Sequence, residues 1–503
     1  MLTQEVQHSH WGSALLAGRP EGYFALLCLT LSQQFLLLGV LSLLPLTTGV
    51  LPAKAEDYSG PDVHRHRALR QFWRQLEEEL EDQVEELEPE WFQHKHMTGD
   101  LAGQRSTFAA WGITPTLTYV SNILGNPVGG QHQKVAYDDN SGLDIDVDLE
   151  KLAGLKDLTF HVSGSFRSGR SLSKVAIGNT FPVSSLFGGE TIRLYELSLE
   201  QSFLEDRVSL LIGRFGLGDE FITSPVYSVF LNNAIDGNPI SVPLNVPAFS
   251  SQSYPVAQWG FRATVRPVQE WYVMAGISNG DRTLSRNSTH GVDFSFRSDA
   301  DIFTIGEAGY LRNQQENATG LPGNYKFGGY YDAGPFPDLY HDKHGHSYVA
   351  SGLPPRTEHN NYGFYLLIDQ QMYREIDPKH NQGLIPFAGV TFAPSDINTF
   401  PFFFLAGLIY NGPIPGRDRD TAGLGIAYGQ FSDELQGSQR LDQKLNGSSN
   451  GVQHFEMILE LTYQIELAPH LVVQPDAQYI IRPGGTGRIP DVLVLGVQIA
   501  INL

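Results

Sequence analysis

The feature that most constrains the fold of this chain is an alternation of apolar and acidic side chains with a period of two residues. Between Leu143 and Lys151, apolar residues occupy every second position and a carboxylate stands between each pair. A β-strand points successive side chains to opposite faces, so this segment has one apolar face and one strongly charged face. Residues 454–464 repeat the pattern. Their apolar face carries Phe455, Met457, Leu459, Leu461 and Tyr463, and their polar face carries His454, Glu456, Glu460, Thr462 and Gln464.

About sixteen segments of this kind follow one another from residue 113 to the end of the chain. Most are about 9 to 12 residues long, which is the length that a tilted strand needs to cross a bilayer, whereas strands in soluble proteins average closer to five or six residues. The predicted strands are 113–121, 143–152, 157–166, 191–202, 207–214, 258–267, 270–279, 302–311, 325–333, 362–373, 383–393, 402–410, 420–431, 452–465, 470–480 and 491–503.

The connections between these segments alternate in length. Short links include 203–206, 267–269 and 468–469, and the long links are 122–142, 167–190, 215–257, 280–301, 334–361 and 432–451. Long loops on one rim and tight turns on the other are typical of a transmembrane barrel. The link 312–324 is an exception, because it is long where a tight turn is expected.

A closed antiparallel barrel explains the two faces of the strands. In lipid every backbone amide must pair within the protein, and a closed barrel achieves this without a free edge. The apolar faces then meet lipid, because a charge there costs up to about 2–4 kcal/mol at the bilayer centre for a cation and less for an acid. The carboxylates expected to face the lumen are Asp144, Asp146, Asp148, Glu456 and Glu460. Several carboxylates on one face require a wet interior, which predicts a channel. A water-soluble sandwich is the alternative, and it gives no reason for the bias in loop length.

The N-terminal region reads as an export signal. Residues 35–50 are almost wholly apolar, and Ala53-Lys54-Ala55 follows as a small-residue cleavage site. We therefore expect residues 1–55 to be a cleaved signal peptide. The alternative is a permanent anchor helix, but the apolar run is shorter than the roughly 20 residues that a membrane span needs. Cys28, the one cysteine of the chain, lies in this segment, so the mature protein has no disulfide.

Residues 56–98 carry a different pattern. Apolar residues recur there at three- and four-residue steps among many carboxylates, which predicts an N-terminal amphipathic acidic helix over about 67–88 in a periplasmic segment. The apolar positions are Leu69, Phe72, Leu76, Leu80, Val84 and Leu87. The helix forms either a short trimeric coiled coil or a cover for the periplasmic mouth, and a solvated tail is the third interpretation. Residues 99–503 then form the barrel.

Composition excludes several functions. The formal net charge of −21 argues against nucleic acid as a partner, which needs clustered Lys and Arg. Phosphate-loop, nucleophile-elbow and zinc-helix motifs are missing from the sequence, so we expect neither an enzyme nor a cofactor. A barrel lipid hydrolase is disfavoured, because His161 and Ser163 are predicted to point inward. The cluster of His341, Asp342, His344 and His346 is interpreted as a solvated loop rather than a metal site.

Several motifs resemble one known family. They are Thr98-Gly99-Asp100 with Gly103 and Arg105, then Gly213-Arg214-Phe215, Gly218-Asp219-Glu220-Phe221, Asn233-Ala234 with Asp236-Gly237-Asn238-Pro239, and residues 474–485. In this order they resemble the carbohydrate-selective outer-membrane porin family (OprB type), over roughly residues 90–503. The resemblance implies a sixteen-stranded barrel in the bacterial outer membrane that passes monosaccharides and similar small polyols, often as a homotrimer. The final Leu503 departs from the aromatic residue that commonly ends such barrels, and the acidic helix is an addition.

The long connection 215–257 is the candidate constriction, since in a porin a loop in this position can fold inward. A neutral sugar needs hydrogen-bonding groups beside an aromatic surface, and binding weak enough for release. The predicted loop residues are Asp219, Glu220, Phe221, Tyr227, Phe230, Asn232, Asn233 and Asp236. The predicted wall residues are Arg262, Arg266, Glu196, Asp369, Gln474, Asp476 and Gln478. Opposed rows of arginines and acids would create a field across the pore. The alternative to a sugar-selective pore is a general or weakly cation-selective porin without sugar selectivity.

Overall fold

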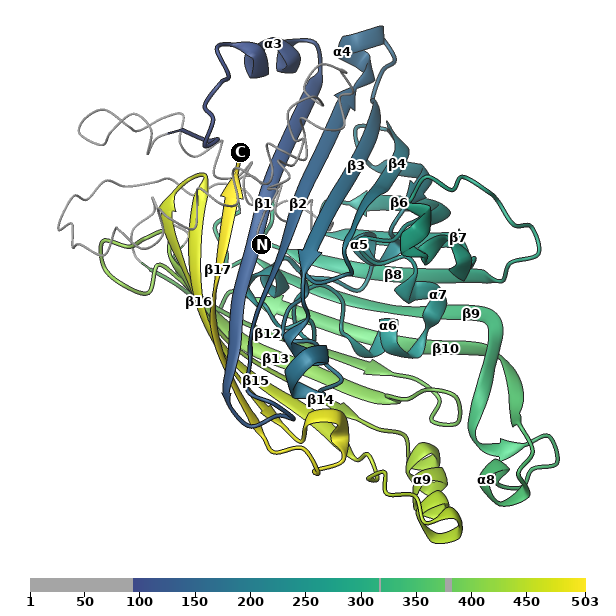
Figure 1. Cartoon of the computed structure of the whole chain (residues 1–503). Coiled ribbons are helices and arrows are strands. Elements are labelled where there is room, and N and C mark those ends of the chain that lie inside the picture. The colour runs from purple at the N-terminus through teal and green to yellow at the C-terminus, as the bar shows by residue number, and fades with distance from the viewer. Residues whose placement is uncertain (1–93, 316–317, 376–381) are drawn as a thin grey trace, which may run out of the picture. The chain divides into compact units, whose positions relative to one another are not determined.

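A computed structural model describes residues 94–315, 318–375 and 382–503. Within this part of the chain, seventeen strands form one sheet, and β11 (Tyr373–Arg374) is only two residues long. The other sixteen are long, every pairing is antiparallel, and β1 pairs with both β2 and β17, so the sheet closes (Figure 1). The predicted sixteen-stranded antiparallel barrel is therefore confirmed. The predicted signal peptide (1–55) and the acidic helix (67–88) lie outside the described residues.

Each of the sixteen long strands overlaps one predicted strand. They are β1 Ile113–Val128, β2 Val135–Asp148, β3 Leu158–Gly169, β4 Thr191–Phe203, β5 Val208–Phe215, β6 Gln258–Val268, β7 Trp271–Asn279, β8 Ile302–Arg312, β9 Gly323–Asp342, β10 Pro355–Gln370, β12 Gly383–Phe392, β13 Phe402–Asn411, β14 Thr421–Gln430, β15 Phe455–Ala468, β16 Leu471–Ile481 and β17 Val492–Asn502.

Two connections predicted as long loops are wrong, because strands occupy most of them. The predicted loop 122–142 is largely β1 and β2, with residues 129–134 between them, and the predicted loop 334–361 is largely β9 and β10. In the first hairpin the Asn126 side chain donates to the carbonyls of Gly129 and His132 at 3.0 and 2.8 Å. The apolar alternation used to find strands is interrupted there by residues 125–127 in β1 and 138–140 in β2, although the backbone ladder continues.

The two faces of the strands are as predicted. Leu461 on β15 and Leu424 on β14 are 59% and 51% exposed on the outside, whereas Asp144, Glu456 and Glu460 are buried on the inside. Asp148 is an exception. Its side chain caps the helix α4 (Leu149–Ala153) by accepting from the backbone N–H groups of residues 150 and 151 at the short-turn rim, so β2 ends there instead of continuing to residue 152.

Short helices lie in the connections. They are α3 Gln104–Ala110, α4, α5 Leu217–Glu220, α6 Ser241–Asn245, α7 Pro247–Ser250, α8 Tyr348–Ser351 and α9 Asp433–Asn446. In the described part of the chain, none of the helices has the length and apolarity needed to cross a membrane. Figure 1 shows α5, α6 and α7, which belong to the connection between β5 and β6, inside the curve of the sheet.

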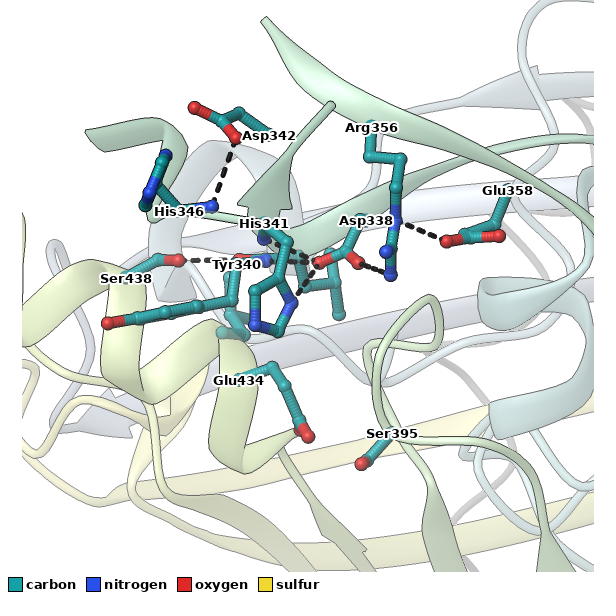
Figure 2. Close-up of polar contacts among 12 residues, drawn as sticks. Asp338, Tyr340, His341, Asp342, His346, Arg356, Glu358, Ser395, Glu434 and Ser438 are labelled. Carbon is teal, nitrogen blue, oxygen red and sulfur yellow. Dashed lines mark hydrogen bonds and ion pairs between the residues drawn. The ribbon is translucent and has the colours of Figure 1, made fainter. Parts of the chain in front are cut away.

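The predicted loop around His341 is partly strand: His341 and Asp342 end β9, and His344 and His346 lie in the turn that follows (Figure 2). Asp338 accepts the backbone N–H groups of Tyr340 and His341 at 2.8 and 2.7 Å and an N–H of Arg356 at 2.9 Å. Ser438 of α9 donates to the carbonyl of residue 339 at 2.5 Å. Among the described residues, His, Cys, Asp and Glu side chains do not gather in threes at a position suited to a metal ion.

Candidate pore constriction

The connection 216–257 crosses the inside of the barrel and is tied to strands far from its own. The backbone N–H of Ile222 donates to Glu307 of β8 at 3.2 Å, and Ser224 donates to Asp369 of β10 at 2.6 Å. Further along, Gln474 of β16 donates to the carbonyl of residue 229 at 2.7 Å, and the Tyr254 hydroxyl donates to residue 140 of β2 at 3.1 Å. This loop, which we call the lumen loop, therefore spans the barrel from wall to wall.

Aromatic side chains fasten the middle of the lumen loop to the wall. Tyr227 and Phe230 are buried and pack edge-on against Phe387 of β12, with ring centroids 5.7 and 5.5 Å apart. The ring of Phe230 lies so close to β14 that a β-carbon on Gly425 would come within 2.8 Å of it. Burial raises the pKa of the Tyr227 phenol well above its ordinary value, with the carboxylates of residues 369 and 307 adding to the effect. These rings are packing anchors rather than an exposed platform for a solute.

A second connection, 170–190, also folds inward and lies against the lumen loop. The N–H of Asn233 donates to the carbonyl of Pro182 at 2.9 Å, and the N–H of Ser185 donates to the carbonyl of Leu231 at 3.2 Å. The Ser185 hydroxyl donates to Asp236 at 2.5 Å. This second inward loop was not predicted, because its length alone does not distinguish it from the other long connections.

The two loops and β3 enclose a cavity of about 320 Å³, within the size range of small-molecule sites. Three predicted residues line it, namely Asp219, Asn233 and Asp236. Arg167, Phe187, Asn238 and Tyr254 also line it and were not predicted. The guanidinium of Arg167 lies over the ring of Tyr254, 4.4 Å from its centroid. Arg167 continues the inward face of Ser163 and Ser165, so extending the predicted strand by a residue or two would have found it.

The other predicted residues do not line the cavity, and most of them form contacts within the wall or between the wall and the lumen loop. Arg262 bonds Glu220 at 3.1 Å and Glu200 at 2.8 Å. The Asn232 side chain donates a hydrogen bond to Gln478 at 2.8 Å, and Gln478 donates to Asp476 at 2.9 Å. The hydrogen bonds of Asp369 and Gln474 to the lumen loop are given above. Phe221 is buried, and Glu196 accepts from Ser198 at 2.6 Å on its own strand. Arg266 is partly exposed near the short-turn rim.

Arginines lie on the inward faces of the four consecutive strands β3 to β6, and the field across the pore that opposed rows of charge would create stays a prediction. Arg262 of β6 forms ion pairs with two carboxylates, those of Glu200 and Glu220. Three other arginines, Arg167, Arg193 and Arg214, lie on the inward faces of β3, β4 and β5. Two of them hold the connection 280–301: Arg193 donates to the carbonyl of residue 285 at 3.0 Å, and Arg214 to that of residue 293 at 3.0 Å.

A closed barrel of sixteen long strands with connections folded into its lumen defines the class of protein, an outer-membrane porin. The family follows from comparison: residues 132–503 match the model of the carbohydrate-selective porin, OprB family, and the chain belongs to that family. Porin B of Pseudomonas aeruginosa is 28% identical over 424 residues, covering 80% of this chain and 90% of that protein.

Solved structures agree with this assignment. The high-pH structure of OprB from Pseudomonas putida superposes with a TM-score of 0.76 at 27% identity, covering 82% of this chain and 99% of the other. The low-pH structure of the same porin gives a TM-score of 0.52 at 21% identity, with 81% and 98% covered, and supports the fold. The protein thus resides in the bacterial outer membrane, where the long-loop rim faces outward and the short-turn rim faces the periplasm.

Proposed function

We propose that the chain carries monosaccharides and similar small polar solutes by passive diffusion, and that they pass through the cavity between the two inward loops. The observation that carries this proposal is the lining of that cavity. Asp219, Asn233 and Asp236 offer hydrogen-bonding groups, and Phe187 and Tyr254 offer aromatic surface beside them. Hydroxyl groups over an apolar ring are the features of a sugar, and a partly polar, partly aromatic wall complements both. In this proposal the solute passes by diffusion alone, without a metal or a cofactor.

Liposome swelling tests this proposal directly. Vesicles containing the purified protein are expected to swell faster in an isosmotic monosaccharide than in an amino acid of similar size, because the amino acid carries full charges that must shed water in the cavity. Empty vesicles are the control. Failure of every sugar tested to cause swelling above that of empty vesicles contradicts the proposal.

The alternative is a weakly cation-selective porin without sugar preference, and one observation favours it. Two carboxylates, Asp219 and Asp236, share the cavity lining with one guanidinium, that of Arg167. The lining therefore has a formal excess of one negative charge among these three groups, which favours cations over anions.

The double substitution Asp219→Asn and Asp236→Asn is expected to lower the ratio of cation to anion permeability about fivefold. A unit charge about 4 Å away in water contributes about 1 kcal/mol to the energy of an ion, and ~1 kcal/mol changes occupancy about fivefold. Reversal potentials across a salt gradient measure the ratio. Asp442→Asn in α9 makes the same chemical change outside the cavity lining and serves as the control. An unchanged ratio in the double variant removes these carboxylates from the ion path.

The division of the chain and its assembly also remain proposals. We propose that residues 1–55 are a cleaved signal peptide, that residues 56–98 form a periplasmic acidic helical segment, and that the mature protein is a homotrimer. The apolar run with its small-residue site supports the first, and the acidic amphipathic pattern supports the second. The resemblance to trimeric members of the family supports the third.

A further inference from the structure

Two carboxylates of β15 were expected to face a wet lumen, and the structure gives them another surrounding. Glu456 and Glu460 lie four residues apart on the inward face of the strand, and they are 0% and 1% exposed. Neither is among the residues that line the cavity. Each instead accepts backbone N–H groups from one of the two inward loops.

Glu456 holds the connection 170–190. One carboxylate oxygen accepts the N–H groups of Thr180 and Phe181 at 3.0 and 2.7 Å, and the other accepts those of Thr180 and Gly484 at 2.9 and 2.5 Å. Both oxygens are therefore acceptors, and three backbone donors of two connections converge on one side chain.

Glu460 holds the lumen loop in the same way. Its Oε1 accepts the N–H groups of Leu231 and Asn232 at 2.5 and 3.3 Å, and its Oε2 accepts that of Asn232 at 3.2 Å. On the neighbouring strand β16, Gln478 accepts from the Asn232 side chain and donates to Asp476, so that it connects the lumen loop to the wall beside Glu460. We call each glutamate with the backbone N–H groups that it accepts a clamp, and the two clamps lie side by side on the inward face of β15.

The segments held by these clamps are the ones that border the cavity. Thr180, Pro182 and Ser185 line it from the first loop, and Asn233 and Asp236 line it from the second. A clamp acts directly on Thr180, and the residues clamped at 231 and 232 immediately precede Asn233. A shift of either loop away from β15 would therefore move the wall of the cavity itself.

From this arrangement we infer that Glu456 and Glu460 are positioning residues for permeation: they fix the width and selectivity of the constriction without touching the solute. An ionised carboxylate suits the role, because both of its oxygens accept hydrogen bonds. A glutamine in place of Glu456 would turn an amide NH₂ toward the N–H of Phe181 or that of Gly484 and leave that buried donor without its acceptor. A glutamine in place of Glu460, with its carbonyl oxygen at the Oε1 position, would place an NH₂ against the N–H of Asn232 and leave this donor only its 3.3 Å contact. The inference extends the proposed sugar pathway, and rests on it only for the sugar measurement below.

The test compares Glu456→Gln and Glu460→Gln with the wild-type protein, each as the full chain in planar lipid bilayers. Each substitution is expected to raise the population of wider, higher-conductance substates about tenfold, which corresponds to ~1.4 kcal/mol. Liposome swelling should change with it, so that the rate for a disaccharide rises relative to that for a monosaccharide. Asp144→Asn is the matched control, since Asp144 is an equally buried inward carboxylate that hydrogen-bonds Ser163 on the neighbouring wall strand.

Conductance in simple salt separates this inference from the sugar proposal, because it needs no sugar to pass. Heat-modifiable electrophoretic mobility shows that a variant barrel is folded. If both glutamine variants are folded and have the same conductance substates as the wild type, the positioning role is overturned. If a glutamine variant does not fold, Glu456→Asp and Glu460→Asp provide the same decision, since they keep the charge but withdraw the carboxylate by one methylene. Wild-type conductance in the folded aspartate variants likewise overturns the inference, and an Asp144→Asn pore as altered as the others does so too.

Discussion

Replacing Arg262 with alanine is expected to lower the free energy of unfolding by about 3–5 kcal/mol, because it removes a buried cation that pairs with two carboxylates, one of them fully buried. The Arg262 side chain is 2% exposed and sits between Glu220 of the lumen loop and Glu200 of β4. It also donates to the hydroxyl of Ser209 at 2.6 Å. The variant therefore loses a connection between wall and loop as well as the compensation of charge.

Unfolding by guanidinium of barrels refolded in phospholipid vesicles, followed by tryptophan fluorescence, measures this effect. Arg266→Ala is the control, since Arg266 lies on the same strand, is partly exposed near the short-turn rim, and is expected to cost no more than about 0.5 kcal/mol. A triple variant, Arg262→Met with Glu200→Gln and Glu220→Gln, should recover most of the loss, because a buried ion pair replaced as a whole is often close to neutral. A loss below about 1 kcal/mol in Arg262→Ala contradicts the view that this cation is needed in the interior.

The barrel could be predicted because the bilayer imposes a rule on every strand. One face of each strand meets hydrocarbon, so an apolar residue at every second position persists through the chain, and the strand boundaries of β4, β6 and β13 fall within a residue or so of those predicted. The prediction fell short at the outer ends of β9 and β10. Where a strand projects beyond the lipid, nothing requires apolar residues on its outer face, and the ladder of backbone hydrogen bonds leaves no trace in the sequence.

The interior was harder to predict for a physical reason. Alternation indicates which side chains point inward, but a glutamate on that face serves equally well in water or against a backbone N–H group. Glu460 was predicted to border a wet lumen and is instead packed against the lumen loop. The same applies to Phe221 and Phe230, whose aromatic rings suit either a sugar or a buried contact.

One sequence signal for the packed interior was present. Gly423 and Gly425 occupy alternate inward positions of β14, and the Phe230 ring lies within 3.2 and 2.8 Å of where their β-carbons would stand. Glycine in a strand often marks the close approach of another part of the chain. Such inward glycines, set beside a long aromatic loop, predict the wall against which that loop packs, although they do not identify which loop residue occupies the space.

The outward face offers the second large effect, since it meets lipid over the middle of β15. Leu461 is 59% exposed there and pairs across the sheet with Leu424, which is also exposed. Leu461→Arg is expected to lower the free energy of unfolding by about 2–4 kcal/mol, because the guanidinium must either enter hydrocarbon or draw water and headgroups into the membrane.

The same strand provides a matched control for depth. Leu467 is 46% exposed and lies at the end of β15, next to the short-turn rim, where an arginine is expected to cost about 0–1 kcal/mol because its charge reaches the headgroups. Both variants are measured by guanidinium unfolding in vesicles of one lipid, so that the composition of the side chain is constant and only its depth differs. Equal losses for Leu461→Arg and Leu467→Arg would mean that the middle of β15 does not face hydrocarbon. Because the lipid-facing assignment of every other strand follows the same alternation, such a result would place the membrane at a different height on the barrel.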